Sequence, residues 1–481
     1  MNLQTTDLML IADGETAAVE AKTPPGKPKF YDTFNYIANP DRFCRENFEK
    51  YGPIFKTSVF GGTTVFVGSA SAIKMAFNGD QKYTEIALPA TTMEMFGEYS
   101  LFQRPDLHRQ RKTALAPGLT GATLEGYATH INNIIARGIK TWANRKIQLY
   151  PEVEKISFDI LTPLLLGISL NDSDPKTFEG LPISSKAELK ALYKTYFDGF
   201  YGLLKWKSPL TTFGRGIKAR VKLIEFMDAV IKRRLAEDEN INPTQDFLSM
   251  MLASQQEEPD GVFSDTLIKN QCLLQLWASH YEISGFICSL IYQLGKHPQI
   301  LQRLRQEQVQ ILGENNNFSQ FSPADLKQMI FLEATIKETL RTLPPSPTAS
   351  RRLTQSVVVD DILYRKGWTL VAEPRIAHIM PEYFQQPEKF EPERFLPERG
   401  EGKMYEFIPF GGGVHACLGA QMAMLVSKVF ASHLLQIFDW QLMGEPKFVQ
   451  FPIKRIKDDY QIDISRKEAT GNRQQATGGK N

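Results

Sequence analysis

Near its C-terminal end the chain reads Pro409-Phe410-Gly411-Gly412-Gly413-Val414-His415-Ala416-Cys417-Leu418-Gly419. Three adjacent glycines let the backbone approach a flat partner more closely than residues with a Cβ could. An amphipathic stretch from Leu418 to about Phe438 follows, so Cys417 stands where a helix begins, and the positive end of that helix stabilises a thiolate. Such a thiolate can ligate an iron. The alternative interpretation of the same residues is a buried cysteine at a turn before a helix.

Two further motifs precede this loop. Glu338 and Arg341 are three residues apart on a predicted helix over residues 331–343, so they share a face and can pair. On an exposed helix such a pair would contribute only about 0.3 to 0.5 kcal/mol. The segment Pro392-Glu393-Arg394-Phe395 follows, before Cys417.

Together these residues resemble the cytochrome P450 family, whose haem-ligand signature reads F-x-x-G-x-[RH]-x-C-x-G. Every fixed position of the signature is met, by Phe410, Gly413, His415, Cys417 and Gly419. The resemblance covers roughly residues 24 to 465. It implies a mainly α fold with small β-sheets, in which a long central helix lies over the haem.

The resemblance also implies the cofactor and its ligand. Haem b is expected, with Cys417 as the axial ligand to the iron, and electron donation by the thiolate favours O–O cleavage. His415 stands where the family has an arginine or histidine against a haem propionate, and Phe410, Gly411 and Gly419 belong to the loop beneath the haem. The family places the Glu338–Arg341 pair in the interior and completes it with an arginine, here Arg394.

The remaining propionate contacts are ambiguous by one residue. Arg351 occupies the position of a propionate-binding arginine, with Arg352 beside it. His108 and Lys112 match the first and last positions of the family's [WH]-x-x-x-R helix, but the last residue is lysine, and Arg111 lies one residue earlier. A basic, solvated helix face is the alternative, because runs of charge are usually solvated.

A long proline-free segment from about Ser264 to Leu294 predicts a single buried helix of about 30 residues, roughly 45 Å long. The family's A-[GA]-x-[DE]-T-[TS] motif is altered in this segment. Aligned on Ala278, Tyr281 replaces the acid and Glu282 the threonine; shifted by one residue, Glu282 keeps the acid and Ile283 replaces the threonine. We expect a buried Glu282 to have a raised pKa and to be either a proton donor or a group that orients substrate. Tyr281 and Ser284 are further candidates for a proton relay.

Length and composition set limits on the protein's class. The chain has 481 residues, 42% of them apolar, and a formal charge of +2, which favours no nucleic-acid partner. No apolar run near the N-terminus reaches the roughly 20 residues of a membrane span, so neither a signal peptide nor a membrane anchor is expected. The scattered cysteines favour a reducing cytoplasm.

The patterns also predict an organisation along the chain. Residues 1–23 are expected to be a flexible N-terminal segment, residues 24–466 a single cytochrome P450-like domain, and residues 467–481 a disordered tail. Two β-rich runs, 54–60 and 63–67, flank Gly61-Gly62 and predict a two-residue hairpin. Residues 357–371 predict a second hairpin.

The expected function is a haem-thiolate monooxygenase that inserts one oxygen atom from O2 into an apolar or mixed-polarity organic metabolite. The chain has no room for a flavin or nicotinamide domain, so electrons must come from a ferredoxin or flavodoxin, and we expect a monomer. By analogy with the family, substrate would contact residues 88–96, 278–282 and 346–349. Because the acid–threonine pair is altered, a peroxygenase, dehydratase or isomerase is an alternative, and a non-catalytic haem sensor or electron carrier is another.

Overall fold

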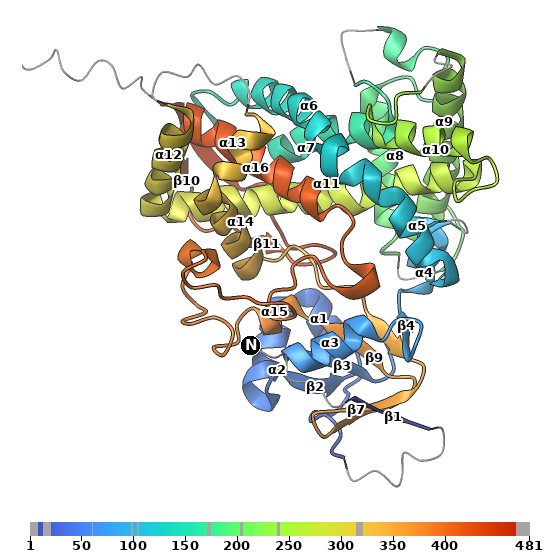
Figure 1. Ribbon diagram of the computed structural model, residues 1–481, viewed down its shortest axis with the longest axis vertical. Coiled ribbons are helices and arrows are strands. Elements are labelled where there is room, and N and C mark those ends of the chain that lie inside the picture. Colours follow the sequence, from blue (N-terminus) through green and yellow to red (C-terminus); the bar gives the residue numbers. More distant parts are fainter. Residues whose placement is uncertain are drawn as a thin grey trace, which may run out of the picture.

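The computed structural model describes residues 8–12, 21–59, 61–97, 100–102, 105–170, 175–202, 205–237, 241–313 and 321–467. A large helical part lies against a smaller part that is rich in β-strands (Figure 1). The helices of the described residues are α1 (Asp32–Ala38), α2 (Pro40–Tyr51), α3 (Ala70–Asn78), α4 (Ala90–Phe96), α5 (His108–Leu115), α6 (Gly121–Lys140), α7 (Leu149–Leu166), α8 (Lys186–Gly199), α9 (Thr212–Glu237), α10 (Phe247–Glu257), α11 (Asp265–Lys296), α12 (Pro298–Leu312), α13 (Pro323–Gln328), α14 (Ile330–Thr342), α15 (Pro374–Ala377) and α16 (Ala420–Ile437). The mainly α fold predicted from the sequence is confirmed.

Helix α11 is the axis of the helical part and crosses its whole width (Figure 1). It begins where Ser264 caps it by accepting a hydrogen bond from the backbone N–H of Leu267. Its 32 residues correspond to a length of about 48 Å. The side chains of Cys272, Leu273 and Leu274, which point about 100° apart, are almost fully buried. Helices pack around it on most sides, as the apolar pattern of this segment predicts.

The strands form four small sheets. The described strands are β1 (Leu8–Ile11), β2 (Ile54–Thr57), β3 (Thr64–Val67), β4 (Thr84–Ile86), β5 (Arg145–Gln148), β6 (Arg351–Leu353), β7 (Ser356–Val359), β8 (Ile362–Tyr364), β9 (Thr369–Ala372), β10 (Phe438–Leu442), β11 (Phe448–Val449), β12 (Arg455–Ile456) and β13 (Gln461–Arg466). The largest sheet has the order β2-β3-β9-β6-β4, in which only the β3–β9 pair is parallel.

Both predicted hairpins exist, with different bounds. Strands β2 and β3 pair antiparallel from Thr57 and Thr64 outward, so the loop between them is longer than the two glycines. Gly61 and Gly62 have φ angles of 81° and 70°, the left-handed region that glycine adopts without strain. The second hairpin is β7 with β8, whereas β9 leaves it and joins the larger sheet.

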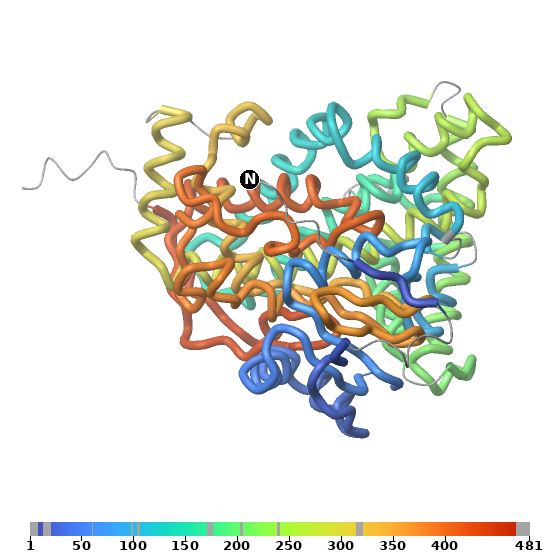
Figure 2. Tube along the Cα trace, turned by 60° about the horizontal axis from the view of Figure 1, so that its bottom comes forward, coloured from blue at the N-terminus to red at the C-terminus, as the bar shows by residue number. Residues whose placement is uncertain are grey.

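Strand β1 lies in the segment for which the sequence predicted flexibility. Leu8 to Ile11 pair antiparallel with Val359 to Ser356, and Lys22 bridges to Ile362. Ile11 is buried against Val358 and Leu363, so this edge strand extends the small sheet and adds an apolar side chain to its buried face. Figure 2 shows the N-terminal strand beside the β7–β9 region, although the two are far apart in the sequence. The predicted tail, residues 467–481, lies outside the described residues from position 468 on.

The helices of the described residues also bear on membrane association. None of them combines the length and the apolar character that a membrane span requires.

The elements that matter for the site are α11, the loop after α14, strand β6 and the loop before α16, since these converge on one cavity.

Candidate active site

The loop before α16 holds Cys417 in a fixed position. The backbone N–H of Cys417 donates to the carbonyl oxygen of Phe410 at 2.8 Å, which closes the loop on itself. Gly413 has a φ of 65°, and a Cβ there would lie 2.2 Å from the carbonyl oxygen of Phe77. A Cβ on Gly412 would lie 2.3 Å from the Phe77 ring. Two of the three glycines, Gly412 and Gly413, are therefore required by the close approach of Phe77 on α3.

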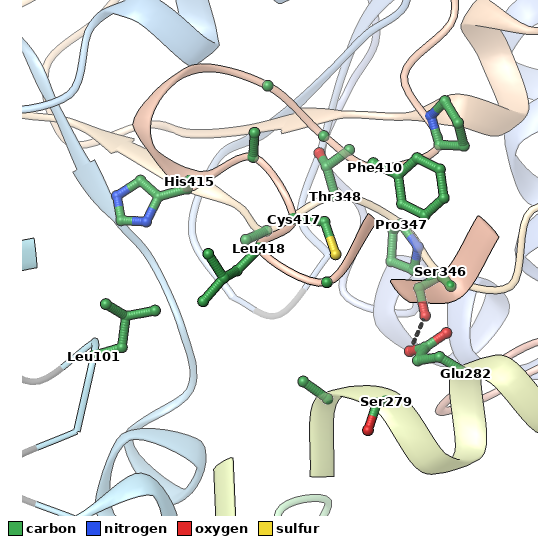
Figure 3. A pocket seen from close by; sticks show the side chains of 18 of the residues that line it. Leu101, Ser279, Glu282, Ser346, Pro347, Thr348, Phe410, His415, Cys417 and Leu418 are labelled. Carbon is green, nitrogen blue, oxygen red and sulfur yellow. Dashed lines mark hydrogen bonds between the residues drawn. The ribbon is translucent and has the colours of Figure 1, made fainter. Parts of the chain in front are cut away.

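Cys417 opens into a cavity of about 300 Å³. In Figure 3 its sulfur points across the cavity toward α11, which carries Ser279 and Glu282. The other three cysteines are buried in the core, so Cys417 is the thiol available to a ligand in this cavity. Burial raises the pKa of the Cys417 thiol, while the backbone N–H of Gly419 and the charge of Lys112 act in the opposite direction.

Four basic side chains line the same cavity. They come from three parts of the chain, namely α5, strand β6 and the loop before α16: His108, Lys112, Arg351 and His415. The ring nitrogens of His108 lie 3.2 Å from the carbonyl oxygens of Leu101 and Val414, and a neutral ring donates to only one of them. Lys112 donates to the carbonyl oxygens of Val414, at 2.9 Å, and Ala416.

The structure places the two residues of each ambiguous pair differently. Lys112 lines the cavity, whereas Arg111 is buried and donates to the carbonyl oxygen of Ser100 at 2.7 Å. Arg351 is buried at the cavity, whereas Arg352 is exposed to solvent. Successive residues point about 100° apart on a helix and to opposite sides of a strand. Only one residue of each pair can therefore face the cavity: Lys112 on α5 and Arg351 on β6. Burial lowers the pKa of Arg351 to about 10, although the charge of Asp80 raises it.

Asp80 is a neighbour of His415 that no motif in the sequence indicates. Its carboxylate lies 3.1 Å from Nε2 of His415, and the rings of His415 and His108 are 4.0 Å apart. Burial lowers the pKa of His415 to about 4, while the hydrogen bond to Asp80 raises it. Burial would raise the pKa of Asp80, but the hydrogen bond and charge of His415 keep it below its ordinary value. A lone aspartate far from any motif gave no signal in the sequence.

Glu282 lies on the wall that α11 presents to the cavity, together with Ala278, Ser279 and Ile283. Its Oε1 accepts a hydrogen bond from the Ser346 hydroxyl, and Figure 3 shows this contact beside the cavity. Its Oε2 is buried and has no hydrogen-bond partner among the described residues. Burial raises the pKa of Glu282 to about 7, although the hydrogen bond from Ser346 and the charge of Arg375 lower it.

The two other relay candidates are not brought to the cavity. The ring of Tyr281 packs against Phe197, with centroids 3.9 Å apart, and stacks on Tyr193. The Ser284 hydroxyl is fully buried and donates to the carbonyl oxygen of His280 at 2.6 Å. Both residues lie on other faces of α11 than Glu282, because one or two positions rotate a side chain by about 100° or 200°.

Of the three segments predicted to contact substrate, two line the cavity and one does not. Ser346 to Ala349 line the cavity, as does α11 at Ala278, Ser279 and Glu282. Residues 88–96 do not reach it; Phe96 instead packs behind Phe102, which lines it, with ring centroids 5.1 Å apart. Phe77 and Leu101 also line the cavity and were missed, because nothing in the sequence marks an apolar residue as cavity-lining.

Comparison with known proteins agrees with this geometry. Residues 22–460 match the family model described as cytochrome P450. The chain belongs to the cytochrome P450 family. A cytochrome P450 120 of Synechocystis sp. is 30% identical over 451 residues, which cover 92% of this chain and 96% of the relative. A taxane 10-beta-hydroxylase of Taxus cuspidata is 26% identical over 88% of this chain and 85% of its own length.

A solved structure is similar over nearly the whole chain. It is described as a retinoic acid-bound cyanobacterial CYP120A1, and it matches with a TM-score of 0.80 and 28% sequence identity. The match covers 93% of this chain and 100% of the other. The family consists of monooxygenases that carry haem with a thiolate cysteine as axial ligand, so this P450 is a haem-containing oxidoreductase.

The residues around the cavity fit a haem. A haem carries two carboxylates, and the basic side chains at one end of the cavity leave donor groups for them. The Nε of Arg351 is buried there without a hydrogen-bond partner among the described residues. Buried polar groups are rarely left unpaired, so a carboxylate at this position would satisfy this donor.

The P450 fold buries the predicted charge cluster behind this site. Glu338, Arg341 and Arg394 are exposed by 0%, 2% and 0%. Arg341 donates to both carboxylate oxygens of Glu338, at 2.7 and 2.8 Å, and Arg394 donates through Nε at 3.1 Å. The backbone N–H of Glu391 donates to the same carboxylate at 2.8 Å. The prediction of an interior cluster is confirmed, and the surface-pair alternative is wrong.

Proposed function

We propose that this P450 inserts one oxygen atom from O2 into an apolar organic metabolite that carries some polar groups, using electrons from a ferredoxin or flavodoxin. One observation carries the proposal: Cys417 faces α11 across a cavity that combines apolar walls with a single carboxyl among its described lining residues. Such a mixture suits a mostly apolar ligand that is oriented by a few polar contacts.

The similarity to named relatives supports this class of substrate. The solved neighbour binds retinoic acid, and relatives are named for the hydroxylation of taxanes and abscisic acid. These compounds are organic molecules with large apolar parts. We further propose a monomeric, cytoplasmic protein in which residues 24–466 act as one domain.

Cys417 would hold the haem iron. His108, Lys112, Arg351 and His415 would hold the propionates. When bound, the haem supplies the reductive activation of O2. Phe410, Gly411 and Gly419 shape the loop beneath it, and Asp80 positions the His415 ring.

Glu282 would supply a proton on the opposite wall. Its carboxyl has the polarity and position of a general acid, and a general acid is most effective when its pKa lies near the working pH. Ser346 fixes the carboxyl through Oε1 and leaves Oε2 free to give up a proton. Glu282 and Ser346, which come from two separate elements, would take the place of the adjacent acid and threonine of the family.

The ligand assignment can be tested by spectroscopy of the reduced, carbon monoxide-bound protein. Thiolate ligation gives a red-shifted Soret band, which Cys417→Ser should abolish. Cys44→Ser and Cys272→Ser are matched controls in the core and should keep the band. If Cys417→Ser keeps it, the assignment is wrong. Turnover with O2 and a reductase then separates the monooxygenase from a haem sensor or electron carrier.

A further inference from the structure

We propose that Asp41, which lies outside the cavity, is a positioning residue for the proposed proton donor. Its carboxylate holds two basic residues that fix residues 345–348, here called the wall segment, and the wall segment presents the Ser346 hydroxyl to Glu282. The inference rests on the proposed function, in which Glu282 supplies a proton. Asp41 belongs to α2 and is not among the described residues that line the cavity.

Four charged side chains form a cluster outside the cavity. One carboxylate oxygen of Asp41 accepts a hydrogen bond from Nζ of Lys454 at 2.6 Å, and the other accepts one from Nε of Arg375 at 2.9 Å. Arg375 also donates to Glu373 at 3.0 Å. Figure 1 shows α15, which carries Arg375, beside α2. Lys454, Arg375 and Glu373 are buried, so the carboxylates hold the two cations in place of water.

Both ends of the wall segment are tied to this cluster. The backbone N–H of Lys454 donates to the carbonyl oxygen of Pro345 at 2.7 Å, so a residue of the cluster holds the first end. At the last end, the Thr348 hydroxyl donates to the carbonyl oxygen of Ala372. Ala372 directly precedes Glu373, the second carboxylate of the cluster. A movement of the cluster would therefore displace the wall segment.

Ser346 lies between these two ties and donates its hydroxyl to Oε1 of Glu282. Figure 3 shows this contact at the edge of the cavity, with Pro347 beside it. A serine hydroxyl can rotate, but its oxygen is placed by the backbone. Pro345 and Pro347 flank Ser346 and restrict that backbone, so a displacement at one end is carried to the hydroxyl.

The groups that face Glu282 come from several elements. Burial raises the pKa of Glu282 to about 7, while the hydrogen bond from Ser346 and the charge of Arg375 lower it. Tyr201 and Cys417 face it as well, since the charge of Glu282 adds to burial in raising the pKa of both. Arg375 is thus a member of the cluster and also a charge that Glu282 senses.

Positioning and simple electrostatics predict opposite effects of Asp41→Asn. Without the Asp41 charge, the charge of Arg375 is less compensated, and this alone would lower the pKa of Glu282. If the wall segment moves instead, the carboxylate of Glu282 loses the hydrogen bond from Ser346, and its pKa rises. The direction of the shift therefore separates the two effects.

The test is a titration of the Glu282 carboxyl in the haem-loaded protein, by infrared difference spectroscopy of its C=O stretch. Glu282→Gln lacks this band and identifies it. Ser346→Ala should raise the titration midpoint by roughly 1 to 2 pH units, the contribution of a hydrogen bond to a charged group. Asp41→Asn should also raise the midpoint, but it should cause no further rise when Ser346 is already alanine.

Asp228→Asn is the matched control, because Asp228 also bridges two lysines, which belong to α9 and α11. It should leave the Glu282 midpoint unchanged. A midpoint that falls in Asp41→Asn, or keeps its wild-type value, overturns the proposal. An equal rise with and without the Ser346 hydroxyl overturns it too.

Lys454→Met is a second variant, which decides the question if Asp41→Asn does not fold. It removes the ammonium but leaves Asp41 paired with Arg375, so no buried charge is left alone. The rise in the Glu282 midpoint should be smaller when Ser346 is already alanine. Equal rises in both backgrounds would refute the role of the cluster in positioning.

Turnover separates this proposal from the proposed function. A proton donor works in its protonated form, so the raised midpoint in Asp41→Asn should extend O2-driven turnover to higher pH by the same amount. If Glu282→Gln keeps full turnover, the proposed proton role fails. An unchanged midpoint in Asp41→Asn together with a large loss of turnover in Glu282→Gln removes only the positioning role.

Discussion

Removal of the Glu338 carboxylate should cost more stability than any other single change in the buried charge cluster. The carboxylate accepts four hydrogen bonds, from Arg341 twice, from Arg394 and from the Glu391 backbone. In Glu338→Ala, Arg394 keeps the Glu401 carboxylate at 2.7 Å, whereas Arg341 keeps only the carbonyl oxygens of His378 and Lys389 as acceptors among the described residues. The main loss is therefore the uncompensated charge of Arg341.

Breaking a buried ion pair from one side costs about 3 to 5 kcal/mol. That corresponds to a shift of the folding equilibrium by about 10²- to 10⁴-fold, a large part of the 5 to 15 kcal/mol that stabilises a typical protein. Arg341→Ala should cost less, because Glu338 keeps Arg394 and the Glu391 N–H as partners.

The assay is the haem content of the purified protein together with its urea unfolding midpoint. Glu46→Gln is the matched control, since it removes an exposed carboxylate from an i,i+4 pair with Arg42 and should leave both values unchanged. The reasoning is refuted if Glu338→Ala binds a full complement of haem and loses less than about 1 kcal/mol.

Three further outcomes are expected. Glu282→Gln should lower O2-driven turnover roughly 10²- to 10⁴-fold while the substrate-induced spectral shift keeps its affinity; a weakened shift would instead make Glu282 a substrate anchor. Lys112→Met and Arg351→Leu should each weaken haem binding roughly 10- to 100-fold, because each removes a charged hydrogen-bond donor. Arg352→Leu is the control and should leave haem binding unchanged. Equal effects of all three substitutions would contradict the assignment of Lys112 and Arg351 to the propionates. Because the Glu282 pKa is raised in the fold from 4.5 to about 7, the unfolded chain releases this proton first, so the stability of the haem-free protein should fall as the pH rises through that window. The difference between wild type and Glu282→Gln isolates this dependence in pH-resolved urea unfolding, and a difference that does not change with pH would argue against a raised pKa.

Features defined by short-range pattern could be predicted from the sequence. The long helix follows from a proline-free segment whose centre is apolar nearly all round, and the Glu338–Arg341 pair follows from its i,i+3 spacing. The cysteine loop was recognised because its residues are consecutive. These features could be predicted because each is determined by residues that are close together in the sequence.

Features that depend on exact orientation or on distant partners could not be predicted. Lys112 and Arg111 differ by one position, and only the packing of α5 determines which one faces the cavity. Asp80 contacts His415, which lies 335 positions later in the sequence, and Glu282 contacts Ser346, which lies 64 positions later. Neither contact belongs to a shared motif. Contacts of this kind arise from tertiary packing, which a single sequence does not specify.

The pairing of β1 with β7 has a consequence for how the protein is made. Leu10 lies opposite Val357, so β1 leaves the ribosome before its pairing partner, which is made 347 positions later. At typical synthesis rates of 5 to 20 residues per second, that delay lasts roughly 20 to 70 s. Helices α6 to α11 are complete well before then, so the helical part can collapse while β1 is still unpaired. The strand Leu8–Ile11, whose four residues are all apolar, lacks its pairing partner throughout this interval and is therefore open to chaperones and to pairing with a second copy.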